Sequence, residues 1–225
     1  MGARTASEEV KSIRVLVVDD HPLVREWLTN LINQQPDMKV CAGAEDAPEA
    51  LAVIAASTPA VAIVDISLKG RSGLELIKEL KLRLPDLAVL VLSMHDESLY
   101  AERALRAGAR GYIMKRETTS NVIAAIRQVA GGKLYLSESC AALMAERLVQ
   151  PSASASPIEG LSDRELEVFD LLGQGRGTRQ IAETLGVSMK TVQVYYARIK
   201  DKLNLATATE LLREALRWHE SKQLT

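Results

Sequence analysis

The sequence predicts two domains of different class, a doubly wound α/β domain with a five-stranded parallel sheet followed by a small all-α domain of four helices. Over roughly the first 130 residues, short β-branched runs alternate with longer amphipathic segments, as in repeated βα units. A stretch rich in serine, alanine and proline follows, at 151–157. Beyond it, only helical patterns occur. A chain of 225 residues is long enough for two domains, each with its own core.

Five continuous apolar runs predict the strands, because strands covered on both faces of a parallel sheet lose the usual polar alternation. The runs lie at 13–18, 38–42, 61–64, 88–92 and 111–114. Helical patterns follow them at 22–34, 46–56, 72–83, 97–107 and 118–130. At 72–83, one apolar stripe is formed by Leu74, Ile77, Leu80 and Leu84, which recur every three or four residues. Such a sheet places its functional site at the carboxyl ends of the strands.

The domain boundaries follow from glycine, proline and capping signals. The first domain is predicted over 12–131, because Gly131 and Gly132 end its last helix. A linker is predicted over 132–160, with one amphipathic helix at 137–149 and the low-complexity stretch after it. The helical domain is predicted over 161–222. It opens at Ser162, which has the spacing of a capping box with Glu165.

Composition excludes several classes of protein. Apolar residues make up 47% and charged residues 25% of the chain, which is typical of a folded globular protein. The sequence has neither a long apolar run nor the apolar core of a secretion signal, so we expect a cytoplasmic protein without a membrane segment. Its two cysteines lack metal-ligand spacing. Residues 157–225 hold ten basic and ten acidic side chains, so any DNA binding must use a local basic face.

Polar residues end four of the predicted strands. Asp19 and Asp20 follow the first strand and Asp65 follows the third, while Ser93 and Lys115 end the fourth and fifth. Because the carboxyl ends of parallel strands share one edge of the sheet, these side chains should converge. Three carboxylates in one crevice repel each other unless a cation is present, and hard oxygen ligands suit Mg²⁺. The pattern predicts a site that handles a phosphoryl group.

The segments VVDDH, IVDISLKGRSG, VLSMHD and GYIMKR resemble, in order and spacing, the motifs of response-regulator receiver domains, which have a flavodoxin-like fold. The resemblance implies that a histidine kinase phosphorylates Asp65. It also implies that Asp20, Asp65 and the carbonyl of Ser67 hold Mg²⁺, with Asp19 acting mainly through water.

The same resemblance implies roles for three further residues. Lys115 would pair with the phosphoryl oxygens, and Ser93 would move to hydrogen-bond them. Tyr112 matches the aromatic residue that rotates inward on activation, although a half-buried packing role explains it equally well. Lys69 stands where many receivers carry proline. We expect His95 to lie at the rim of the pocket.

The second domain contains a helix–turn–helix pattern. Helical segments at 178–185 and 188–203 are joined at Gly186, which permits a tight bend, and Ser188 should cap the second helix. The early residues of that helix suit base edges in the major groove, and its later basic residues suit phosphates. The predicted DNA-facing residues are Lys190, Thr191, Gln193, Val194, Ala197, Arg198, Lys200 and Lys202.

From LSDRELEV to LLREAL, the chain resembles the LuxR-type DNA-binding domain. Together with a receiver, this indicates the NarL/FixJ family of response regulators, whose partners would be a histidine kinase and double-stranded DNA. Gln193 and Tyr195 depart from the basic residue and histidine that are common in relatives. Glutamine pairs with the N6/N7 edge of adenine, so we hypothesise an altered operator preference.

The nearly neutral domain suggests that DNA binding relies on a homodimer. The last helix offers an apolar stripe of Leu211, Leu212, Ala215 and Trp218, part of which an internal core explains equally well. We expect the unphosphorylated receiver to mask the recognition helix or the dimer face. The predicted function is phosphorylation-gated DNA binding rather than enzymatic turnover. Two alternatives are a phosphorylation-independent DNA binder whose receiver dimerises and a phosphatase that uses Asp65 as its nucleophile.

Overall fold

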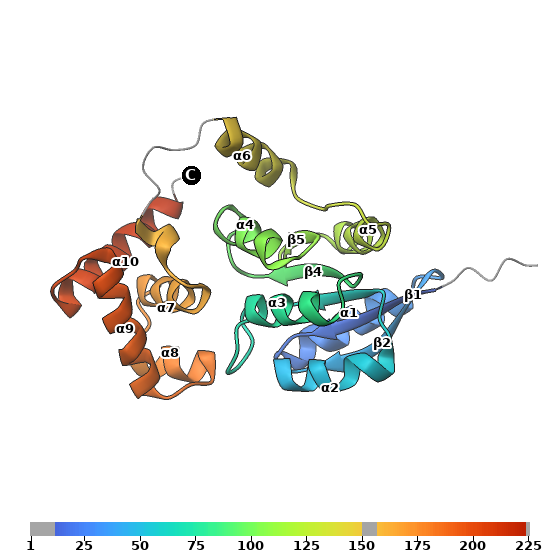
Figure 1. Cartoon of the computed structure of the whole chain (residues 1–225), viewed down its shortest axis with the longest axis horizontal. Coiled ribbons are helices and arrows are strands. Elements are labelled where there is room, and N and C mark those ends of the chain that lie inside the picture. The colour runs from blue at the N-terminus through green and yellow to red at the C-terminus, as the bar shows by residue number, and fades with distance from the viewer. Residues whose placement is uncertain (1–11, 150–156, 224–225) are drawn as a thin grey trace, which may run out of the picture.

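The computed structural model describes residues 12–149 and 157–223, so most of the predicted low-complexity linker lies outside the described residues. Two bodies lie next to each other: an α/β domain and a cluster of helices formed by the C-terminal part of the chain (Figure 1). Of the helices in these two ranges, none combines the length and the apolar character needed to cross a membrane.

The α/β domain is built on a five-stranded parallel sheet with the strand order β2-β1-β3-β4-β5. This confirms the predicted doubly wound fold. The strands are β1 (Ile13–Val18), β2 (Met38–Ala44), β3 (Val61–Val64), β4 (Ala88–Ser93) and β5 (Gly111–Met114). Val18 of β1 lies opposite Val64 of β3, so the residues that follow these two strands lie side by side at one edge.

Five helices cover the two faces of this sheet. They are α1 (Pro22–Asn33), α2 (Ala47–Ser57), α3 (Gly73–Arg83), α4 (Glu97–Ala107) and α5 (Thr119–Ala130). Helices α1 and α5 pack on one face, where Leu28 and Ile126 are fully buried. Helices α2, α3 and α4 pack on the other face. The predicted stripe on α3 is correct for Leu74, Ile77 and Leu80. Leu84 was wrongly included, because it lies after the last residue of the helix and is 38% exposed.

After α5, the chain returns along the edge strand β5. The backbone N–H of Tyr135 donates to the carbonyl of Arg110 (2.9 Å), and the N–H of Tyr112 donates to the carbonyl of Tyr135 (3.0 Å). The next helix, α6 (Glu138–Val149), matches the helix predicted at 137–149 and packs beside α4. The hydroxyls of Ser137 and Ser139 donate to the carboxylate of Glu97 on α4.

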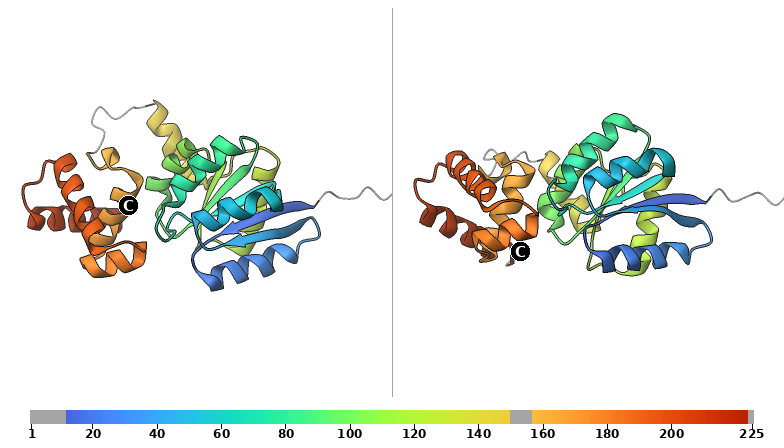
Figure 2. Two further views of the ribbon diagram at one scale, coloured as in Figure 1. Left: turned by 60° about the horizontal axis from the view of Figure 1, so that its bottom comes forward. Right: turned by 90° about the horizontal axis from the view of Figure 1, so that it is seen from below.

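The C-terminal body consists of a short 3₁₀ turn, η1 (Pro157–Gly160), and the helices α7 (Asp163–Gly173), α8 (Thr178–Leu185), α9 (Met189–Leu203) and α10 (Ala208–Gln223). Figure 2 shows these helices as a separate layer beside the α/β domain. The capping box of Ser162 and Glu165 is present. Gly186 adopts the left-handed conformation with φ +63°, and Ser188 accepts a hydrogen bond from the N–H of Thr191. The predicted helix–turn–helix is therefore confirmed.

Candidate functional site

The predicted acidic residues converge at the carboxyl edge of the sheet. The ammonium of Lys115, which follows β5, lies 2.8 Å from Oδ2 of Asp65 and 2.6 Å from Oδ2 of Asp19. The side chains of both aspartates are only 3% exposed. Buried charges are tolerated only when they are paired, so Lys115 holds the two carboxylates together.

Part of this acidic charge is left uncompensated. Oδ1 of Asp65 is buried and accepts no hydrogen bond from the described residues. Ligand atoms of Asp19, Asp20, His21 and Asp65 all lie within 4.8 Å of one another. Burial raises the pKa of Asp20; nearby His21 lowers it, while Asp65 and Asp19 raise it further. Hard carboxylate oxygens with a buried free acceptor fit a divalent cation such as Mg²⁺.

Burial also acts on Lys115. Removal from water would by itself lower the pKa of the ammonium, but the carboxylates of Asp65 and Asp19 outweigh that effect and hold it above its usual value. Lys115 is therefore positively charged at neutral pH. It provides a fixed cation beside Asp65, which can compensate charge added to that carboxylate.

Ser93, Tyr112 and Ser67 are linked to one another through His95. The N–H of His95 donates to the hydroxyl of Ser93 (3.2 Å), and the hydroxyl of Tyr112 donates to the carbonyl of His95 (2.8 Å). The Nε2 atom of His95 lies 2.7 Å from the hydroxyl of Ser67. Tyr112 is only 1% exposed, so its ring is packed inward in this state.

His95 lies at the edge of the pocket, as expected, because it contacts Ser67 and Ser93, but it is not open to solvent. Its side chain is 11% exposed and does not lie on an open rim, because α7 of the helical domain covers it. Nδ1 of His95 lies 3.6 Å from Oδ2 of Asp170 on α7, and its ring packs against Tyr100. No sequence pattern near VLSMHD predicts this contact, because Asp170 lies far along the chain.

The loop between β3 and α3, immediately after Asp65, contacts the helical domain directly. The N–H of Gly70 donates to the carbonyl of Leu185, the last residue of α8 (2.9 Å). Arg164 on α7 donates to the carbonyl of Leu68 (3.2 Å), and the hydroxyl of Ser72 donates to Glu167 (3.2 Å). This contact was not predicted.

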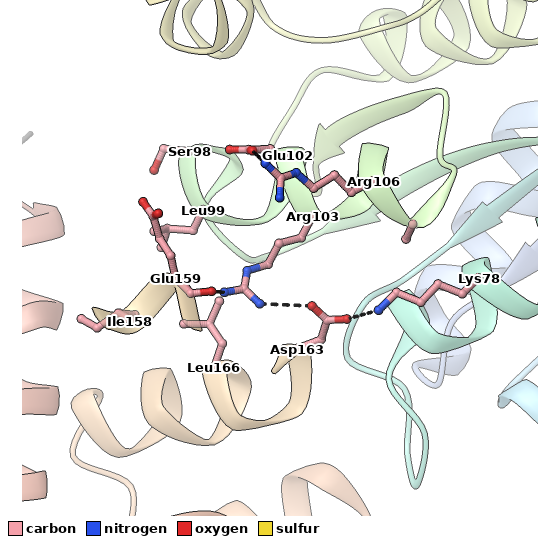
Figure 3. Close-up of a pocket in the computed structure, with 11 residues that line it drawn as sticks. Lys78, Ser98, Leu99, Glu102, Arg103, Arg106, Ile158, Glu159, Asp163 and Leu166 are labelled. Carbon is pink, nitrogen blue, oxygen red and sulfur yellow. Dashed lines mark hydrogen bonds and ion pairs between the residues drawn. The ribbon is translucent and has the colours of Figure 1, made fainter. Parts of the chain in front are cut away.

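A second polar contact between the domains lies at the start of α7 (Figure 3). The carboxylate of Asp163 lies 2.8 Å from the ammonium of Lys78 on α3 and 3.2 Å from the guanidinium of Arg103 on α4. Arg103 also donates to the backbone carbonyls of Leu161 and Glu159. The α/β domain thus contacts α7, the preceding η1 segment and the end of α8.

The exposed face of α9 remains accessible beside these contacts. Lys190, Gln193, Val194, Ala197 and Arg198 are exposed, and Thr191 and Lys200 are partly exposed. A shallow groove runs along the first turns of this helix. The α/β domain therefore does not bury the predicted DNA-facing side chains, which contradicts masking of the recognition helix but not the alternative, masking of the dimer face.

Lys202 differs from the other predicted DNA contacts. Its ammonium lies 2.6 Å from Glu165 and 3.2 Å from the carbonyl of Gly160. The lysine therefore helps to hold the start of α7 against the end of α9, a role that its position in the sequence did not reveal.

The apolar stripe on α10 is partly buried and partly exposed. Leu211 and Ala215 are buried, and the ring of Trp218 packs against Phe169 with 5.2 Å between ring centroids. This part belongs to the internal core. Leu212 and Leu216 are 40% and 37% exposed, so these two leucines form an apolar surface that is open to solvent.

Comparisons with known proteins agree with this geometry. Residues 15–127 match the response regulator receiver domain, and residues 159–215 match the luxR family of bacterial regulatory proteins. A curated relative, the oxygen regulatory protein NreC of Staphylococcus epidermidis, is 35% identical over 91% of this chain and 97% of its own length.

Two solved structures share the fold. A LuxR-family two-component response regulator from Aurantimonas sp. is 33% identical, with a TM-score of 0.58 over 61% of this chain and 99% of its own. A structure of RcsB dimers bound to DNA is 25% identical, with a TM-score of 0.56 over 90% of this chain and 96% of its own. The chain belongs to the response regulators that join a receiver to a LuxR-type DNA-binding domain. It is a two-component regulator of transcription.

Proposed function

We propose that this chain is a cytoplasmic response regulator in which phosphorylation of Asp65 by a histidine kinase controls binding to double-stranded DNA. The observation that carries the proposal is the pocket itself. A buried carboxylate with one free oxygen lies beside a permanently charged lysine. That arrangement suits a carboxylate that accepts a phosphoryl group and then needs its new charge compensated.

The chemical step is a transfer of the phosphoryl group from a histidine nitrogen of the kinase to Oδ1 of Asp65. The N–P bond breaks as the O–P bond forms, and no external oxidant or reductant is required. Lys115 is placed to pair with the phosphoryl oxygens, and the hydroxyl of Ser93 can turn toward them. Asp20, Asp65 and the carbonyl of Ser67 would hold Mg²⁺, which neutralises charge on the transferring group.

DNA would be bound by the exposed face of α9. The early residues Lys190, Thr191, Gln193 and Val194 would read base edges, while Arg198 and Lys200 would contact phosphates. Because this domain carries no excess of positive charge, two copies bound to neighbouring half-sites would supply the affinity. The exposed Leu212 and Leu216 on α10 are candidates for the contact between them. RcsB, which shares the fold, binds DNA as a dimer.

The test compares DNA binding with and without acetyl phosphate and Mg²⁺, using the wild-type chain and Asp65→Asn. We expect the phosphodonor to modify Asp65 and to raise affinity for a site selected from random oligonucleotides. The Asp65→Asn variant should bind with the unstimulated affinity under both conditions. Equal affinity of the wild type with and without the donor would favour a phosphorylation-independent binder. Sustained hydrolysis of a small phosphoester, lost in Asp65→Asn, would favour a phosphatase.

A further inference from the structure

His95 contacts residues of both domains at once. On the receiver side, it interacts with Ser67, Ser93 and Tyr112, which flank the phosphorylation pocket. On the other side, its imidazole lies 3.6 Å from Asp170 of α7. With a side chain only 11% exposed, His95 is enclosed between the pocket and the helical domain.

We propose that His95 is the positioning residue through which phosphorylation of Asp65 changes the contact between the two domains. The inference rests on the proposed function, because it takes the phosphorylation of Asp65 as its input. Beyond the proposed function, the inference names the segments that transmit the change. These are residues 93–95 and the loop at 67–72, which together contact α7 and the end of α8.

The geometry makes this coupling direct. The hydroxyl of Ser93 accepts from the N–H of His95, so a Ser93 that turns toward a phosphoryl group withdraws this acceptor. Ser67 contributes its hydroxyl to the imidazole and its carbonyl to the proposed cation site. Phosphorylation therefore acts on the backbone of His95 through Ser93, and cation binding acts on its ring through Ser67. A shift of either residue changes where the ring lies against Asp170.

The loop at 67–72 extends the effect to the turn before α9. Leu68 accepts from Arg164, and Gly70 donates to Leu185. Gly186 lies against this loop so closely that a Cβ atom on it would lie 3.0 Å from Cβ of Lys69. Movement of the loop that starts at Ser67 would therefore displace the turn between α8 and α9.

The other polar contact between the domains provides an internal control. Asp163 pairs with Lys78 and Arg103, and their interactions are made with η1 and the start of α7 rather than with the pocket. This contact stabilises the closed arrangement whether or not Asp65 is phosphorylated. A variant there should change how often the domains separate without changing the response to phosphorylation.

The experiment measures the ratio of separated to closed molecules by energy transfer between dyes on the full-length chain. Dyes are attached to cysteines introduced at Gln34 and Arg213, both exposed, with Cys41 and Cys140 replaced. Each variant is measured in Mg²⁺ alone, and again with beryllofluoride as a stable phosphoryl mimic. The coupling factor is the ratio with the mimic divided by the ratio without it. Acetyl phosphate followed by mass spectrometry reports phosphorylation of Asp65 separately.

We expect a coupling factor of about fivefold or more in the wild type, as is usual for coupled sites. Asp163→Asn should raise the separated fraction in both conditions and leave the factor unchanged. His95→Ala should bring the factor close to one while Asp65 is still phosphorylated. His95→Gln, whose amide can still reach Ser67, should recover part of it. If His95 had only a structural role, His95→Ala would instead behave like Asp163→Asn and leave the coupling factor unchanged.

An unchanged factor in His95→Ala, or an equal loss in Asp163→Asn, would overturn the inference. A wild-type chain that is phosphorylated but has a factor of one would also overturn it, with Asp65 still the phosphoacceptor. If the wild-type chain acquires no phosphoryl group at Asp65, the proposed function itself is rejected. The two failures are therefore separable.

Discussion

Replacement of Arg164 by methionine should separate the two domains. Arg164 is 5% exposed and pairs with Glu167, which is 1% exposed, beneath the receiver loop at 67–72. The guanidinium also donates to the carbonyls of Leu68 and Leu185. Methionine fills a similar volume but leaves Glu167 with the hydroxyl of Ser72 as its hydrogen-bond donor. In the closed arrangement, Arg164→Met therefore leaves a buried carboxylate without its ion-pair partner.

The magnitude follows from the burial of the pair. Removal of one member of a buried ion pair typically costs about 3–5 kcal/mol. Because Ser72 of the receiver contacts Glu167, we expect separation of the domains to hydrate this carboxylate, so that the cost applies to the closed arrangement. A loss of about 3 kcal/mol shifts an equilibrium by roughly two powers of ten, since about 1.4 kcal/mol is a factor of ten. We expect Arg164→Met to be predominantly separated without any phosphodonor.

The assay is the same energy-transfer measurement, made as a function of pH. Burial raises the pKa of Glu167, although Arg164 and other neighbours oppose the effect. Burial favours the protonated form, so closure of Arg164→Met should improve as the pH falls toward the pKa of Glu167 and weaken as it rises. The matched control is the double variant Arg164→Met/Glu167→Met, which should close again, because an apolar pair has no charge to hydrate. Wild-type energy transfer in the single variant at every pH, or a double variant as separated as the single one, would refute the reasoning.

Three further predictions concern the acidic pocket, the exposed face of α9 and the start of α7. Asp20→Asn should raise the melting temperature in metal-free buffer, because burial and neighbouring carboxylates disfavour its charge, and should abolish the increase that Mg²⁺ produces in the wild type. Gln193→Ala should lose about 1–3 kcal/mol of discrimination at one base position; selection from random oligonucleotides checks this, and a purely sequence-independent loss would contradict it. Burial alone would raise the pKa of Glu165, but Lys202 and Ser162 lower it overall. Because the pKa of Glu165 is lower in the folded protein than its ordinary value of 4.5, its ionised carboxylate stabilises the fold above that pH. This contribution to the free energy of unfolding is lost as the pH falls. Glu165→Gln should therefore unfold at lower urea concentration near neutral pH, with a smaller further loss in acid.

The acidic pocket could be predicted from the sequence because it depends on local patterns. Each of its residues ends an apolar run, and the carboxyl ends of parallel strands must meet at one edge. Strand pairing places Asp19 and Asp65 side by side, as this reasoning requires. The helix–turn–helix was predictable for the same reason, since Ser162, Gly186 and Ser188 act on their immediate neighbours.

The contact between the domains was not predictable in this way. Arg164 and Glu167 read as ordinary charged residues of an exposed helix, yet both are buried. Lys202 reads as a phosphate contact, yet it is paired with Glu165. Burial of such residues depends on a second surface that lies some 95 residues away in the chain, as for Ser72 and Glu167, and no periodicity within either segment carries that information.

The sequence alone therefore determined the two folds, the acidic pocket and the helix proposed to face DNA, because hydrophobic period, turn chemistry and strand-end residues act over short distances. Only the tertiary structure decided which surfaces of the domains meet, that His95 lies between them, and that the face of α9 stays exposed. Those features arise from complementarity between two surfaces that are each compatible with solvent. Such a contact is settled by packing, charge pairing and desolvation across the interface.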